Sequence, residues 1–185
     1  MNDNNTQKSI DSLRKALNFQ FDISWQMLEI HLKDLEDEEC LWRPTPKGLH
    51  VTNKFGTWQA EWPDSEEYDI GPSSIAWLTW HIIFWWSMVF DYSFGNCTLT
   101  REDVEWPGTM TAVREKIEQL HDDWKKILAT LPDEELLSYA KTKWPFEDRP
   151  MYELAAWLNL ELMKNASEIG SGRFLYASRK YIARG

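Results

Sequence analysis

Two carboxylates and an amide lie on one face of a predicted helix near the C-terminus. In the stretch ELMKNASEIG (161–170), Glu161, Asn165 and Glu168 project within an arc of about 60°, at about 100° per residue. Apolar residues of the same helix, such as Trp157, point in that direction. Burying a carboxylate is costly unless it is paired, hydrogen-bonded or bound to a metal. The three polar residues therefore predict a site that draws its partners from other helices.

His81 is the strongest candidate partner. It is the only ionisable residue between Ser74 and Phe90, a segment rich in tryptophan, so we expect protein to surround it. One interpretation is a neutral core histidine with a single hydrogen-bond partner. The other is an imidazole ligand for a divalent metal such as zinc, nickel or iron. The residue alone does not decide between them.

Glu161 and Asn165 are four residues apart and therefore stack on one helix face. This spacing lets one helix offer two ligands to one ion. A carboxylate is a competent metal ligand, whereas a neutral amide suits harder ions better than transition metals. Alternatively, Glu161 is a buried carboxylate paired with His81 or an arginine. Glu168 either supports a ligand by a hydrogen bond or pairs with Arg173.

The remaining histidines and cysteines give weaker signals. His31 and His121 project onto or beside the apolar faces of their helices, and His50 lies in a long loop, so ordinary structural roles are favoured. Cys40 has no neighbouring base, and with only Cys97 besides it there is no disulfide framework or thiolate metal site. A glycine-rich phosphate loop, GxSxG and CxxC are all absent from the sequence.

The composition favours one globular domain over residues 1–185. Hydrophobic residues make up 43% and aromatic residues 14%, and the 12 tryptophans either fill a core or line a pocket. A net charge of −10 argues against nucleic acid or an anionic membrane as a partner. The N-terminus lacks the apolar run of a secretory signal, which favours a cytoplasmic protein. The apolar segment from Ile75 to Phe90 is shorter than the roughly 20 residues of a membrane helix and contains a histidine.

Apolar periodicity predicts four long helices, over about 8–36, 73–90, 110–130 and 150–169. The prolines of WRPTP end the first, and Gly170 and Gly172 are expected to end the fourth, followed by a short C-terminal helix. Residues 48–72 predict a long ordered loop, and no segment has a competitive strand pattern. The predicted fold is all-α, an antiparallel four-helix bundle with long loops.

The segments WRPTP, SSIAWLTWHIIFWW and ELMKNASEIG resemble the DinB/YfiT-like superfamily, bacterial four-helix bundles, over about 13–176. The resemblance implies a divalent metal (Zn, Ni, Mn or Fe) held by His81, Glu161 and Asn165. A glutamate at the first position of the pair is similar to the mycothiol-dependent maleylpyruvate isomerase branch. Asn165 departs from the pattern, because it stands where a histidine is expected.

Two hypotheses follow from the residues and the resemblance. The first is a metal-dependent transferase or isomerase that uses a low-molecular-weight thiol, whose pKa the metal lowers. The second is a metal-free bundle in which His81, Glu161 and Asn165 form a closed hydrogen-bond network, and which binds a small apolar ligand or a protein partner without catalysis. A homodimer through one face of the bundle is compatible with both. The expected pocket walls are Trp58, Trp62, Trp85 and Trp157.

Overall fold

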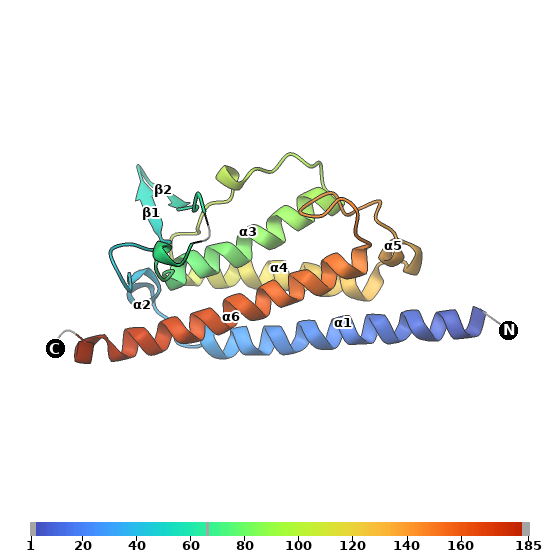
Figure 1. The fold of residues 1–185 in the computed structure, drawn as a ribbon, viewed down its shortest axis with the longest axis horizontal. Coiled ribbons are helices and arrows are strands. Elements are labelled where there is room, and N and C mark those ends of the chain that lie inside the picture. The colour runs from blue at the N-terminus through green and yellow to red at the C-terminus, as the bar shows by residue number, and fades with distance from the viewer. Residues whose placement is uncertain (1–2, 66, 183–185) are drawn as a thin grey trace.

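The computed structural model describes residues 3–65 and 67–182 and has the form of a helical bundle with one small hairpin (Figure 1). The four long helices are α1 (Asp3–Leu32), α3 (Ile75–Phe94), α4 (Met110–Thr130) and α6 (Met151–Ile182). The shorter elements are α2 (Asp37–Leu41), β1 (Val51–Lys54), β2 (Thr57–Ala60), η1 (Tyr68–Ile70), η2 (Arg101–Asp103) and α5 (Asp133–Leu137). The predicted all-α four-helix bundle is confirmed.

The long helices form two parallel pairs that run in opposite directions. Ser24 and His31 of α1 contact Asn159 and Arg173 of α6 in the same order along both helices, so α1 and α6 are parallel. The connection 95–109 returns along the bundle, and α4 therefore starts at the same end as α3 (Figure 1). The pair α1 and α6 is antiparallel to the pair α3 and α4, so α3 packs against α6 with the opposite chain direction.

The second and third long helices each begin directly after a residue whose side chain caps the helix. The Ser74 hydroxyl accepts a hydrogen bond from the Trp77 N–H, and the Thr109 hydroxyl accepts one from the Ala112 N–H. These bonds satisfy donors that have no partner within the helix. Within residues 3–65 and 67–182, no helix is both long and apolar enough to cross a membrane.

The fourth long helix does not end at its glycines. We expected a stop at Gly170 and Gly172 and a separate short C-terminal helix, but α6 continues to Ile182, and residues 183–185 lie outside the described chain. A Cβ on Gly170 would lie 2.6 Å from Cε1 of His31, and one on Gly172 would lie 3.0 Å from Cγ1 of Ile75. The glycines therefore permit close approach to α1 and α3 rather than a change of chain direction.

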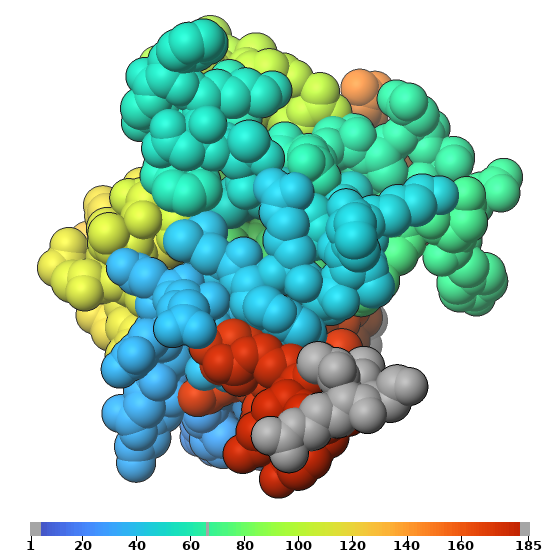
Figure 2. All heavy atoms as spheres, turned by 90° about the vertical axis from the view of Figure 1, so that its left-hand side faces the viewer, coloured from blue at the N-terminus to red at the C-terminus, as the bar shows by residue number. Residues whose placement is uncertain are grey.

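The expected long loop contains a β-hairpin that the sequence pattern did not predict. Val51 pairs with Ala60 and Lys54 with Thr57 in an antiparallel register. Phe55 and Gly56 form the turn with φ of 57° and 96°, a conformation that phenylalanine rarely adopts and that the sequence therefore did not signal. Figure 2 shows this end of the molecule, where the segment between α1 and α3, in light blue to green, lies beside the C-terminal turns of α6, in red.

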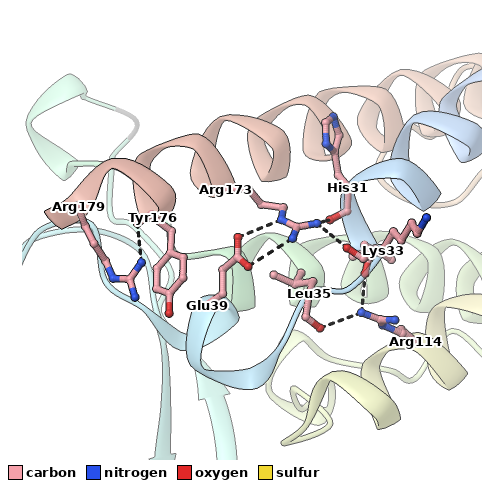
Figure 3. Close-up of polar contacts among 9 residues, drawn as sticks. His31, Lys33, Leu35, Glu39, Arg114, Arg173, Tyr176 and Arg179 are labelled. Atoms are coloured by element: carbon pink, nitrogen blue, oxygen red, sulfur yellow. Dashed lines mark hydrogen bonds and ion pairs between the residues drawn. The ribbon is translucent and has the colours of Figure 1, made fainter. Parts of the chain in front are cut away.

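The C-terminus of α1 is held by two arginines from other helices (Figure 3). Arg173 of α6 and Arg114 of α4 donate hydrogen bonds to carbonyls that have no partner within the helix. Their acceptors are the carbonyls of His31, Leu32, Lys33 and Leu35. Arg173 also pairs with Glu39 of α2, at 3.0 Å. The helix consequently ends at Leu32, four residues before the predicted boundary.

Candidate functional site

His81 and Asn165 meet between α3 and α6. His81 is 5% exposed, and its Nδ1 lies 2.9 Å from Oδ1 of Asn165. The Asn165 amide nitrogen donates to the Glu161 carbonyl oxygen at 2.7 Å, which leaves Oδ1 as the acceptor for His81. His81 therefore carries its proton on Nδ1. The expected contact between the second and fourth long helices is therefore a hydrogen bond between His81 and Asn165.

The second nitrogen of His81 is engaged by a tryptophan one turn further along α3. The indole N–H of Trp85 donates to Nε2 of His81 at 2.8 Å. Trp77 stacks on the other side of the imidazole, with ring centroids 4.6 Å apart. Burial lowers the pKa of His81 from 6.5 to about 4, although the hydrogen bond that His81 donates to Asn165 acts in the opposite direction. The ring is therefore neutral at pH 7, and both of its nitrogens are used.

Trp85 is held in place by the aromatic residues around it. Its ring centroid lies 4.9 Å from that of Trp144 and 4.8 Å from that of Trp157. Trp85 was expected only as a pocket wall, and its hydrogen bond to His81 was missed. The available signal was the spacing of four residues, which places both side chains on one helix face.

The carboxylate of Glu161 has an ion-pair partner on its own helix. It pairs with Lys164 at 2.6 Å, and its side chain is 18% exposed. Beside it, a cavity of about 10 Å³ lies between α3 and α6. That volume corresponds to about one water molecule. Glu161 therefore contributes its backbone carbonyl to the hydrogen-bond chain, while its carboxylate is neutralised by a neighbour on the same helix.

Glu168 takes no part in this network. Its side chain is exposed on α6, and Arg173, its expected ion-pair partner, binds Glu39 instead. The expected pairing of Glu168 with Arg173 is therefore not formed, and the supporting role of Glu168 stays a prediction. The helical projection placed Glu168 on the same face as Asn165, but in the structure Asn165 is buried and Glu168 is exposed.

These residues do not fit a transition-metal site. A neutral imidazole binds a metal through its one unprotonated nitrogen, and that nitrogen of His81 accepts the Trp85 N–H. The Asn165 oxygen accepts the His81 proton, and the Glu161 carboxylate is paired with Lys164. Within residues 3–65 and 67–182, no group of three or more His, Cys, Asp and Glu residues is arranged to hold a metal ion.

Trp58 and Trp62 lie on the hairpin side of α3. Trp58 packs against Trp106 at a centroid distance of 5.1 Å. Trp62 is 41% exposed, lies 6.4 Å from the His81 ring, and has the Arg101 guanidinium 5.2 Å above its own ring. A cleft of about 270 Å³ opens here, lined by Gln59, Ala60, Trp62, Trp80, Arg101, Glu102 and Val104. Arg101 was not predicted as a site residue.

The other histidines and Cys40 have structural surroundings. His121 stacks on Trp25 and hydrogen-bonds to Asp122. His31 lies against Gly170, and His50 is buried at the start of the hairpin. Burial raises the pKa of the Cys40 thiol to about 12, which leaves it protonated and unreactive at pH 7.

The comparisons with known proteins give one match. The sequence model of the DinB superfamily matches residues 20–169, a range that covers most of the bundle, including the contact between His81 and Asn165. Neither the curated proteins nor the solved structures contain a significant match.

Proposed function

The chain belongs to the DinB superfamily, and from that premise we propose that this member works without a metal ion and binds a small apolar molecule. The observation that carries the proposal is the hydrogen bond from Trp85 to Nε2 of His81. It occupies the lone pair that a metal would need. Asn165 stands where a histidine was expected, and it accepts a hydrogen bond from His81 and donates one to the Glu161 carbonyl.

Such a chain has a clear structural role. Each polar group from Trp85 to the Glu161 carbonyl has a partner, so its burial is compensated. The chain joins α3 to α6 and holds the aromatic residues around His81 in position. The ligand would bind in the cleft beside Trp62, whose ring centroid lies 6.4 Å from that of His81.

Elemental analysis of tag-free protein tests the absence of a metal. Wild type and His81→Ala are incubated with excess zinc, nickel, manganese or iron, desalted and analysed. We expect less than stoichiometric metal in both. Stoichiometric metal in wild type that is lost in His81→Ala would overturn the proposal and restore the thiol-dependent transferase or isomerase that the family resemblance implies.

A gain-of-function variant sharpens the same test. Asn165→His combined with Trp85→Phe supplies a second imidazole and removes the N–H that occupies Nε2 of His81. We expect this variant to retain divalent metal after desalting while wild type does not. Thermal-shift assays with small apolar ligands then test binding, and the shift should not respond to a chelator.

A further inference from the structure

We propose that the cleft between β2 and η2 is a binding site for a small aromatic carboxylate. The ligand ring would lie against Trp62, which the buried Trp80 supports, and its carboxylate would bind Arg101. This inference rests on the proposed function: it identifies the apolar part of the ligand as an aromatic ring and adds a carboxylate to that ring. It concerns residues outside the hydrogen-bond chain of His81.

The walls of the cleft are fixed before any ligand binds. Trp80 is 1% exposed, and its indole N–H donates to the Val104 carbonyl at 2.6 Å. The backbone N–H of Trp106 donates to the backbone carbonyl of Trp58 at 3.2 Å, which joins the connection after η2 to the hairpin. A preformed cleft keeps the entropic cost of binding low.

Trp62 gives the cleft an accessible aromatic surface. Its ring makes edge contacts with Trp80 and Phe84, at centroid distances of 6.2 Å and 5.5 Å, so it is held although 41% exposed. Aromatic rings bind other rings in edge-to-face or offset geometry. A cavity of about 150 Å³ holds benzene. The cleft, at about 270 Å³, therefore has room for one ring and a carboxylate.

Arg101 provides the charge that selects a carboxylate. It is the only basic residue among those that line the cleft. Its Nε and Nη2 both contact one oxygen of the neighbouring Glu102, at 3.1 Å and 2.5 Å. The Glu102 side chain is 65% exposed, so this ion pair is weak and a ligand carboxylate can replace it. The planar guanidinium matches a carboxylate in a two-bond geometry.

Glu102 and Arg101 should therefore have opposite effects on binding. Glu102 competes with the ligand for Arg101 and repels its charge. Glu102→Gln should tighten binding several-fold, whereas Arg101→Gln should weaken it about tenfold or more. Arg149, an exposed arginine paired with Glu153 on α6, offers a matched control.

The test compares three probes of one shape by isothermal titration calorimetry: benzoate, benzyl alcohol and benzylamine. We expect benzoate to bind wild type best. Arg101→Gln and Trp62→Ala should weaken benzoate, Glu102→Gln should strengthen it, and Arg149→Gln should leave it unchanged. In Arg101→Gln, benzoate should lose its advantage over benzyl alcohol.

Several results would overturn this inference and leave the proposed function standing. They are equal affinity for benzoate and benzyl alcohol, benzoate binding that is insensitive to Arg101→Gln, preference for benzylamine, or no binding of benzoate up to about 10 mM. Failure of the proposed function is a separate result, because it is decided by the metal content of the protein.

Discussion

A neutral imidazole has one donor and one acceptor nitrogen, and His81 uses both inside the protein. The Nδ1–H of His81 donates a hydrogen bond to Asn165, and the indole N–H of Trp85 donates one to Nε2 of His81. Burial disfavours the protonated imidazole more strongly than the hydrogen bond to Asn165 favours it, so the pKa of His81 falls to about 4. The residue is therefore a structural hydrogen-bonding group at neutral pH, with little capacity to exchange protons.

The low pKa of His81 predicts a pH-dependent stability. In the unfolded chain a histidine takes up its proton near pH 6.5, well above the folded value of about 4. The stabilisation is therefore complete above about pH 6.5 and is lost as the pH falls toward 4, by about 3 kcal/mol in total. Urea unfolding of wild type and His81→Gln at about pH 7, 6, 5 and 4.5 checks this. The wild type should lose more stability on acidification, and parallel pH curves would contradict the assignment.

The sequence predicted part of this site correctly. Helical spacing predicted that Asn165 faces inward, and the tryptophan-rich surroundings predicted a buried His81. Spacing does not specify side-chain rotamers, however. It could not indicate that the Trp85 indole N–H reaches His81, or that the Glu161 carboxylate turns to Lys164. Those two contacts decide whether a metal fits.

Local sequence pattern explains the correct prediction of α4, and close helix packing explains the error in predicting α6. Helix α4 has the bounds that its apolar periodicity predicted, and in the structure Thr109 caps its start. Helix α6 was predicted too short because Gly170 and Gly172 were interpreted as stop signals. A glycine in a sequence does not reveal whether it ends a helix or admits a neighbour, because that depends on tertiary contacts.

A double-mutant cycle tests the packing role of Gly170. Gly170→Ala adds a Cβ that would lie 2.6 Å from the His31 ring, so we expect a loss of about 1 kcal/mol in wild type. In a His31→Ala background the clash is absent, and the better helix propensity of alanine should give a gain of about 1 kcal/mol. Chemical denaturation of the four proteins measures the coupling. An equal effect in both backgrounds would show that the contact is unimportant.

Arg173 of α6, which caps the end of α1, should contribute more to the free energy of unfolding than Arg179, a more exposed arginine of α6. Arg173→Met removes the pair with Glu39 and the hydrogen bonds to the carbonyls of His31, in α1, and Lys33, just after it, so we expect a loss of about 2–3 kcal/mol. Arg179→Met is the control, because its pair with Glu38 is long, at 3.7 Å, and exposed. It should cost about 1 kcal/mol or less. Similar losses in the two variants would argue against the capping role.

At the scale of the whole molecule, tryptophans join the long connections to the bundle. Trp80, Trp86, Trp106 and Trp124 are among the largest fully buried side chains. The Trp106 indole N–H donates to the Thr79 hydroxyl in α3, and its ring packs against Trp58 of the hairpin. The tryptophans therefore both fill the core and form the wall of a cleft. The hairpin is consequently attached to the bundle through buried contacts.

This attachment predicts that the hairpin and the bundle unfold together. Tryptophan fluorescence reports on both parts, whereas circular dichroism at 222 nm reports mainly on the helices, and we expect coincident transitions in urea. Trp106→Ala should lower the free energy of unfolding by about 3–5 kcal/mol, because it removes a side chain that is 1% exposed. Its two transitions should shift together if Trp106 belongs to one cooperative core. A fluorescence change that precedes loss of helix, in wild type, would mean that the hairpin opens independently and that the cleft beside Trp62 is not preformed.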